Sequence, residues 1–159
     1  MDDVTVARAL HVVAVVLWIG GVAMVTTILL PAVRRFKSVE ERVTFFTSVE
    51  RRFAWQARGT TLLAGVTGFY MVDRLDLWWS FFDRQYWWLD AMGLLWLAFT
   101  TMLFVAEPLF LDRWFEKNAR LAPERTFSTI HRLHQVLLLL SLITIFGAVA
   151  GSHGLSFFD

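Results

Sequence analysis

The sequence predicts an all-α integral membrane protein, a four-helix bundle that forms a single domain over residues 1–159. First, 57% of the residues are hydrophobic, whereas soluble domains contain about 45–50%. Second, the chain has eight tryptophans and fifteen phenylalanines, and aromatic residues collect at membrane interfaces. Third, four apolar segments alternate with charged ones. Because lipid offers the backbone no hydrogen-bond partner, each spanning segment must be a helix.

The four spans are expected at about residues 9–31, 54–73, 87–111 and 130–151. The first apolar run extends from Ala9 to Pro31. This length is sufficient, because about 20 residues at 1.5 Å rise cross a hydrocarbon core of about 30 Å. The purely apolar parts of the second and fourth segments are shorter. We therefore expect both helices to extend toward their N-termini through polar residues that face the bundle.

The basic residues predict the orientation of these spans. They concentrate in two connections, residues 34–58 and 113–132, whereas the remainder of the chain has only Arg8, Arg74 and Arg84. Cytoplasmic loops carry an excess of Lys and Arg. The sequence thus predicts an N-out, C-out protein of a bacterial-type inner (plasma) membrane, with membrane lipid as its surroundings. No cleavable signal peptide is expected, because the chain starts Met-Asp-Asp and lacks a basic n-region.

The connection between the first two spans is expected to be helical as well. Val43, Phe46, Val49 and Phe53 recur at helical spacing with charges between them. Ser38 followed by Glu41 fits a capping box at the start of this segment. We expect a cytoplasmic amphipathic helical extension that lies on the membrane or continues into the second span.

The connection between the second and third spans is rich in aromatic residues. Residues 75–88 include four tryptophans and a tyrosine. Such a segment is typical of an aromatic belt at the level of the headgroups. An alternative interpretation is a flat aromatic platform for a planar ligand or a quinone.

Alternating helix directions place the polar residues of the spans at two levels. A histidine inside a membrane span is costly unless it is bound, so His11 is a candidate functional residue. At its level we expect Met71, Asp90, Met92 and His153, and at the opposite level Arg58, Glu107, His131 and His134.

These two levels predict one or two sites. His11 and His134 lie about 20–25 Å apart by helical rise, too far for one shared ligand. An outer haem b would use His11 with His153, Met71 or Met92, since His–His and His–Met ligation are both common. His134 and His131 would serve an inner haem, a metal or a proton path. The buried Glu107 must be paired, protonated or a ligand.

The first span resembles a known family. The stretch Arg8-Ala-Leu-His11, with Trp18 seven residues after the histidine and then Gly21, resembles the first helix of HemJ-type protoporphyrinogen oxidases and of the broader CopD-like four-helix membrane proteins. Weaker similarities are Trp88-Leu89, His134-Gln135 and the small residues Gly65 and Gly68. Asp90 and Gly93 stand where HemJ has basic residues. The resemblance implies that His11 is a haem ligand.

Three functions are consistent with these observations. The leading hypothesis is a haem b protein with one or two haems, which acts in electron transfer or oxidation with a quinone or a redox protein. Trp18 would pack against the macrocycle, and Arg58 would pair with a propionate or with Glu107. The second hypothesis is copper transport or resistance of the CopD type, with the histidines and methionines as ligands. The third is an accessory subunit of a membrane complex.

Composition and motifs exclude other classes. The chain has no cysteine, which excludes thiolate metal sites, disulfides and cysteine nucleophiles. Nucleic acid is not an expected partner, because the topology accounts for the basic residues and the sequence has no glycine-rich phosphate loop. A second copy of the chain remains a candidate partner.

Overall fold

The computed structural model describes residues 3–155, and this part of the chain is helical with no β-strand. Its elements follow the chain in the order α1 (Asp3–Met24), a π-helical turn η1 (Val25–Leu29), α2 (Leu30–Val33), α3 (Val39–Arg74), the 3-10 turns η2 (Trp78–Ser80) and η3 (Arg84–Tyr86), α4 (Trp87–Thr101), a π-helix η4 (Met102–Leu111), α5 (Asp112–Leu121) and α6 (Pro123–Ser152).

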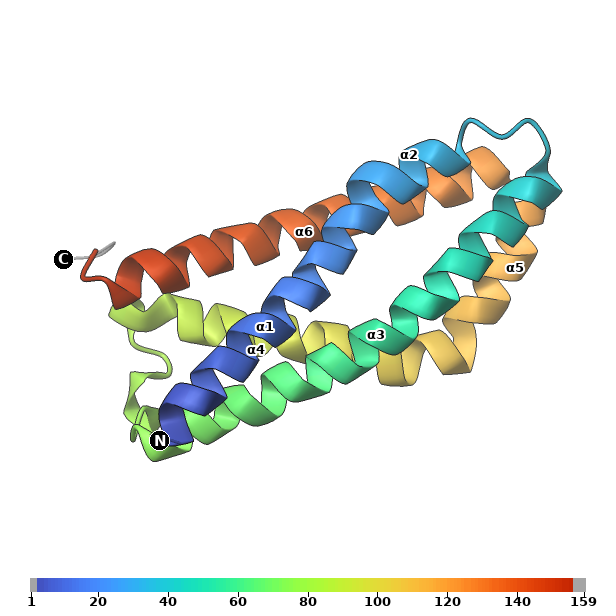
Figure 1. The fold of residues 1–159 in the computed structure, drawn as a ribbon. Helices are drawn as coiled ribbons and strands as arrows, with labels where there is room; N and C mark the ends of the chain where they lie inside the picture. Colours follow the sequence, from blue (N-terminus) through green and yellow to red (C-terminus); the bar gives the residue numbers. More distant parts are fainter. Residues whose placement is uncertain (1–2, 156–159) are drawn as a thin grey trace.

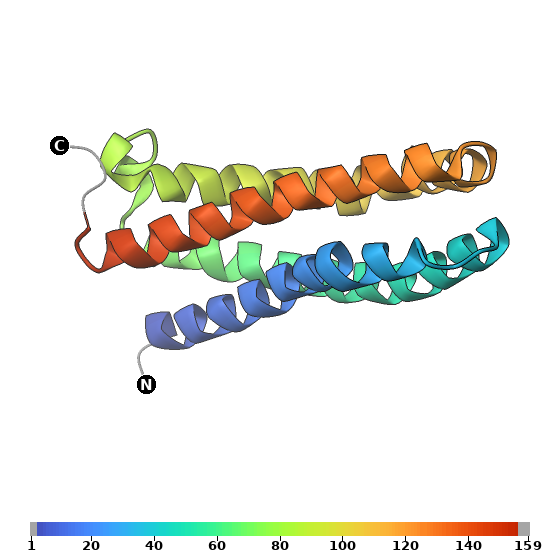
Figure 2. The ribbon, with the colours of Figure 1, turned by 90° about the horizontal axis from the view of Figure 1, so that it is seen from above.

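The helices form an elongated bundle of two layers. α1 packs mainly against α3, while α6 packs against α4 and α5 (Figure 1 and Figure 2). Both views place the start of α1, the end of α6 and the connection 75–86 at one end, which we call the terminal end. The opposite end carries the loop 34–38 and the junction between α5 and α6, so we call it the basic end.

Three of the described helices have the length and apolar composition needed to cross a membrane. They are Asp3–Val33, Arg84–Leu121 and Pro123–Ser152. The first and third predicted spans lie within continuous helices, as expected. The fourth predicted span lies within α6, which extends toward its N-terminus to Pro123, as expected. Proline suits the first turn of a helix, where its missing N–H costs nothing. A membrane-spanning helical bundle is thus the class of protein that this fold supports.

α3 contains the second predicted span and differs from the other long helices. It runs through 36 residues without a break, so the amphipathic extension continues directly into the predicted span. Ser38 caps its start, because the hydroxyl accepts a hydrogen bond from the N–H of Glu41 at 3.4 Å. α3 does not meet the apolar composition of the other three helices.

Some of the polar residues that lower the hydropathy of α3 face the interior of the bundle. Thr60, Thr61 and Thr67 are buried. The Thr60 hydroxyl donates to the Gln56 carbonyl at 2.9 Å, and the Thr67 hydroxyl donates to the Leu63 carbonyl at 2.6 Å. Helices of membrane bundles use such small and hydroxylated residues for close contact.

The outward surface of the bundle is apolar along its middle. Large hydrophobic side chains are exposed on every long helix of the described chain, for example Val16 of α1, Val66 of α3, Leu97 of α4 and Phe146 of α6. A soluble protein rarely exposes contiguous apolar surface on this scale. Lipid accounts for this surface, because apolar side chains lose nothing by facing hydrocarbon.

Two buried clusters hold the layers together. One lies at the basic end and includes Phe46 of α3 and Phe127 of α6, whose rings meet edge to face with centroids 5.6 Å apart. The other lies nearer the middle and includes Ala14 and Trp18 of α1, Ala64 of α3 and Phe99 of α4. Aromatic pairs of this geometry add to the free energy gained by burial.

The connection 75–86 has both an inner and an outer face. Trp78, Trp79 and Phe82 are exposed, and 94% of Phe82 is accessible. The backbone of Phe82 is left-handed at φ 66°, a region that bulky residues rarely adopt. The Asp90 carboxylate accepts the Phe82 N–H at 3.1 and 3.3 Å, which holds this turn. The exposed rings agree with the expected aromatic belt.

Glycines allow large aromatic rings to enter the helix interfaces. The Trp96 indole N–H donates to the Thr61 carbonyl at 3.0 Å, and a Cβ on Gly65 would lie only 2.5 Å from that indole nitrogen. A Cβ on Gly59, on the same helix, would meet no neighbour within 4 Å. Gly65 is therefore required by packing, whereas Gly59 is not.

We expect Gly65→Ala to lower the free energy of unfolding by about 1–3 kcal/mol, because the new methyl group displaces a hydrogen-bonded ring. Gly59→Ala is the matched control and should be neutral or more stable by up to about 1 kcal/mol, since alanine favours helix. Thermal unfolding in detergent, followed by circular dichroism, measures both. Equal stability of the two variants would contradict this account of the α3–α4 interface.

Candidate functional site

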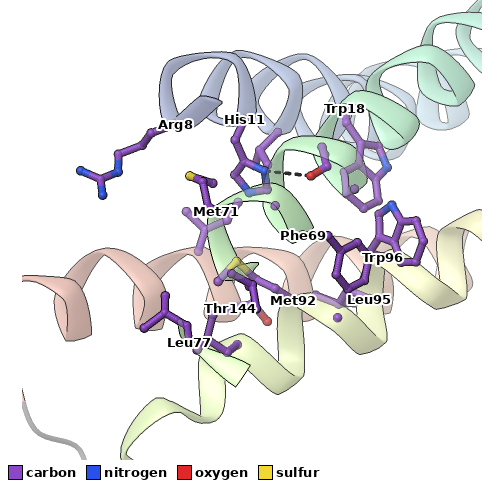
Figure 3. Close-up of a pocket in the computed structure, with 18 of the residues that line it drawn as sticks. Arg8, His11, Trp18, Phe69, Met71, Leu77, Met92, Leu95, Trp96 and Thr144 are labelled. Atoms are coloured by element: carbon purple, nitrogen blue, oxygen red, sulfur yellow. Dashed lines mark hydrogen bonds between the residues drawn. The ribbon is translucent and has the colours of Figure 1, made fainter. Parts of the chain in front are cut away.

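An apolar cavity of about 290 Å³ lies between the two layers near the terminal end. This volume is at the lower end of the range of small-molecule sites. Its walls come from α1, α3, α4 and α6, and Leu77 and Phe81 of the connection close one side. Figure 3 shows His11, Trp18, Met71, Met92 and Trp96 around it. The other lining residues are Arg8, Val15, Ile19, Ala64, Gly65, Gly68, Phe69, Val72, Leu75, Leu89, Gly93, Leu95, Ser141, Thr144 and Ile145.

His11 is held against α3 by its Nδ1 atom. Nδ1 lies 2.9 Å from the Ala64 carbonyl oxygen and 3.1 Å from the Thr67 hydroxyl. Gly68 makes room for the ring, since a Cβ there would lie 3.2 Å from the His11 Cε1 atom. The hydroxyl of Thr67 already donates to the carbonyl of Leu63.

These contacts determine which nitrogen of His11 carries the proton. A carbonyl oxygen can only accept, so Nδ1 must donate and Nε2 of the neutral ring keeps its lone pair. No described residue forms a hydrogen bond with Nε2. Metal-ligating histidines typically have this arrangement, in which the other ring N–H is bound by a carbonyl or carboxylate.

The structure brings together three of the five residues predicted at the outer level. His11, Met71 and Met92 line the same cavity, and Figure 3 shows the sulfur atoms of both methionines on the cavity side. Trp18 lines it too, is 5% exposed and meets Phe99 edge to face with ring centroids 4.9 Å apart. Asp90 and His153, the other two residues predicted at this level, do not line the cavity.

His134 and His153 bind the backbone of their own helix. Nδ1 of His153 lies 2.8 Å from the Val149 carbonyl oxygen, and the side chain is exposed at the end of α6. Nδ1 of His134 lies 2.9 Å from the Ile130 carbonyl oxygen, while His131 is half-buried one turn earlier. Residues 3–155 contain no group of three or more His, Asp or Glu side chains placed to hold a metal ion.

Arg58 and Glu107 form an ion pair between α3 and η4. The Arg58 Nη2 donates to the Glu107 Oε1 at 2.8 Å, and both side chains are mostly buried. Of the two partners proposed for Arg58, a propionate or Glu107, the structure thus has Glu107. The Trp55 ring lies 5.6 Å from the Arg58 guanidinium carbon and adds a cation–π contact.

Arg58 also compensates for a proline in the π-helix. In a π-helix the N–H of one residue bonds to the carbonyl five residues earlier. Pro108 has no N–H, and the carbonyl five residues before it belongs to Leu103. The Arg58 Nε donates to this carbonyl at 3.1 Å. Arg58 therefore joins α3 to η4 at the point where the proline interrupts the helical bonds.

Glu50 is a second carboxyl group near this pair, which the sequence did not single out. It lies on α3, before the predicted span, and is half-buried. Burial and the nearby carboxylates of Glu107 and Asp112 raise the pKa of Glu50 from 4.5 to about 7, against the opposing effect of Arg58. The sequence places Glu50 about two helical turns before Arg58 on α3, and this spacing could have marked it as a neighbour of that arginine. The sequence could not have shown that Asp112, which lies on α5, comes near Glu50.

Arg8 and the closing residues Leu77 and Phe81 are further cavity residues that sequence reasoning missed. Arg8 precedes His11 by three residues, so the two side chains share a helix face. That spacing was the available signal. For Leu77 and Phe81 the sequence held none, because the fold of the connection decides which of its aromatic and aliphatic residues turn inward.

The chain matches no protein-family model, no curated protein and no solved structure. What can be inferred about the site therefore depends on its residues and geometry.

Loss of Glu107 should strongly destabilise the bundle. We expect Glu107→Leu to lower the free energy of unfolding by about 3 kcal/mol, because the buried Arg58 charge would lose its partner. The double variant Arg58→Met/Glu107→Leu should recover part of this loss. The exposed pair of Arg74 and Asp3, at 3.2 Å, is the control, and Asp3→Asn should cost less than about 1 kcal/mol. Urea or thermal unfolding measures both variants. If Glu107→Leu and Asp3→Asn lower the free energy of unfolding equally, the buried pair contributes no more to stability than the exposed pair.

Glu50 should make stability depend on pH. Between pH 4.5 and about 7 the unfolded carboxyl group has lost its proton while the folded one retains it, so stability decreases as pH rises through this range. We therefore expect Glu50→Gln to gain stability relative to the wild type as pH rises from 4.5 to about 7. Thermal unfolding across this range measures the difference. Glu116→Gln, at an exposed position of α5, is the control, and parallel curves for wild type and Glu50→Gln would contradict the prediction.

Proposed function

We propose that the protein binds haem b within the membrane and acts in electron transfer or oxidation, with His11 as an axial ligand of the iron. The hydrogen bond between the His11 Nδ1 and the Ala64 carbonyl, at 2.9 Å, carries this proposal. It leaves the Nε2 lone pair available on a ring that lines a cavity. His131, His134 and His153 do not line this cavity.

The available donors suit a haem. Haem iron needs only one or two ligands from the protein, and residues 3–155 hold no group of three or more His, Asp or Glu side chains placed to bind a bare metal ion. Met71 and Met92 line the cavity with His11 and are the candidates for the second axial ligand. The apolar walls suit the macrocycle, and Gly93 leaves room along them, since a Cβ there would come no closer than 4.0 Å to a neighbouring side chain.

The chain's own residues would bind and shield the cofactor, while the haem would supply the redox chemistry. His11 and a methionine would set the ligation, because axial-ligand identity tunes the reduction potential. Trp18, which packs against Phe99 behind it, would form an apolar wall that excludes water from the ring. A quinone or a redox protein is the proposed reaction partner, since neither requires a second metal centre in this chain.

The setting we propose is a bacterial-type inner membrane with the cavity toward the outer side. The basic end carries most of the arginines and lysines, including Arg34, Arg35 and Lys37, and such residues favour the cytoplasm. The resemblance of residues 8–21 to the first helix of HemJ-type and CopD-like proteins agrees with haem binding at His11.

Copper binding is the second candidate function. Its supporting observation is that His11, Met71 and Met92 line one cavity, since imidazole and thioether groups together suit Cu(I). Copper would leave the purified protein without a Soret band.

The test is the visible spectrum of the purified protein, oxidised and reduced, with a pyridine haemochrome assay. We expect a Soret band that shifts on reduction, and we expect His11→Ala to lose the haem. His153→Ala is the matched control, because its exposed ring does not line the cavity, and it should keep full haem content. Met71→Leu and Met92→Leu identify the second ligand, because only its loss should change the α band and the reduction potential.

Two results would reject the haem assignment. A colourless wild-type protein, folded and produced with ample haem, would remove haem binding, and bound copper in that sample would favour the second candidate. A His11→Ala variant with full haem content and an unchanged spectrum would remove His11 as the ligand.

A further inference from the structure

The cavity has few polar groups that are free to meet a ligand. The Trp96 indole donates to the Thr61 carbonyl at 3.0 Å. The Ser141 and Thr144 hydroxyls donate to carbonyls of their own helix at 2.7 and 2.8 Å. His11 uses its Nδ1 on Ala64. Apart from the buried indole N–H of Trp18, the polar groups left over are the His11 Nε2 and the guanidinium of Arg8.

Arg8 lies at the open edge of the cavity. Figure 3 shows it extending from α1 one turn before His11, with its guanidinium directed away from Trp18 and Trp96. The side chain is exposed, so this edge of the cavity is in contact with the surroundings of the bundle. The deep part, around Trp18, is buried. The cavity therefore has an apolar interior and a cationic edge.

Arg8 has no ion pair or hydrogen bond with any described residue. Asp3, the acidic residue at the start of the same helix, is already engaged, because its Oδ2 accepts from Arg74 at 3.2 Å and from the Tyr70 hydroxyl at 2.7 Å. Asp90 instead accepts the N–H of Phe82. Neither carboxylate pairs with Arg8, so its positive charge has no counter-ion among residues 3–155.

We propose that Arg8 binds the anionic edge of the cavity's ligand, so that the site selects an amphiphile with an apolar body and carboxylates along one side. This inference rests on the proposed function, in which haem b is that amphiphile and its two propionates lie toward Arg8. An arginine fork matches a carboxylate through two parallel hydrogen bonds. The apolar edge of the ring then points into the buried part of the cavity.

The arrangement defines which way the ligand faces. His11 and Arg8 share one face of α1, separated by one turn. A ligand held by both must place its metal beside His11 and its acid groups beyond it, toward the terminal end. Arg8 is in this account a specificity-determining residue that distinguishes a free acid from its ester.

The experiment compares haem b with haem b dimethyl ester, which has the same ring and iron but no carboxylate. Apoprotein in mild detergent is titrated with each compound, and the Soret band reports the dissociation constant. The proteins are the wild type, Arg8→Gln and Arg8→Lys, with Arg84→Gln as the control. Arg84 is exposed at the same end of the bundle but does not line the cavity.

For haem b we expect Arg8→Gln to weaken binding about fivefold, as for a partly solvated ion pair. Arg8→Lys should keep part of the affinity, because it keeps the charge without the planar fork. For the ester, all four proteins should bind alike. High salt should weaken the binding of haem b to the wild type but not to Arg8→Gln.

Distinct results overturn distinct conclusions. If Arg8→Gln binds haem b as tightly as the wild type, the role of Arg8 is wrong while haem binding stands. If Arg8→Gln weakens both compounds equally, Arg8 acts on the fold rather than on the carboxylates, and the inference is again rejected. If the wild type binds neither compound, the proposed function fails and the assignment of Arg8 fails with it. Thermal unfolding of each variant confirms that the titrated protein is folded.

Discussion

The close packing of α1 on α3 is the contact on which the candidate site depends. Ala14 of α1 and Ala57 and Ala64 of α3 are almost fully buried, and small residues let two helix backbones approach closely. This approach brings His11 within hydrogen-bond distance of the Ala64 carbonyl. A larger residue at Gly68 would push the imidazole away from α3. One helix interface thus positions the side chain and selects its tautomer.

The interior of the bundle is where the polar groups find partners, as expected for a chain surrounded by hydrocarbon. Thr60 and Thr67 of α3 bond to carbonyls of their own helix, and Arg58 bonds to both Glu107 and the Leu103 carbonyl. Pro108 would otherwise leave a backbone acceptor without a donor inside the third helix. Through these two contacts Arg58 supplies the donor that Pro108 lacks and joins the two layers.

The cavity remains between these layers because the connection 75–86 closes it without filling it. Phe81 and Leu77 turn inward, while Phe82 is directed outward from a left-handed backbone held by Asp90. The interior offers an imidazole lone pair and two thioethers, and the edge offers a guanidinium. Chemistry at this site would be directed by one ligand-binding nitrogen and by the exclusion of water, rather than by a cluster of acids and bases.

Hydropathy and periodicity were sufficient to predict the helices. Apolar runs of membrane length have few alternatives to helix, and each predicted span falls within a continuous helical stretch of the described chain. Ser38 correctly predicted the start of α3, because its cap is local in sequence. The costs of burying His11 and Glu107 in lipid marked both as residues that need a partner, and the pairing of Glu107 with Arg58 was one of the two options considered for that arginine.

The sequence by itself thus determined that the chain is helical, which segments are apolar enough for a membrane, and which buried polar residues require partners, because these properties depend on neighbours within a few turns. Only the tertiary structure decided that Met71 and Met92 share a cavity with His11, that Arg8 lies at the edge of this cavity, and that Asp112 and Glu107 act on Glu50. The physical reason is that these contacts join different helices. They depend on how each helix is rotated and where it crosses its neighbours, and the order of residues along one helix does not specify either.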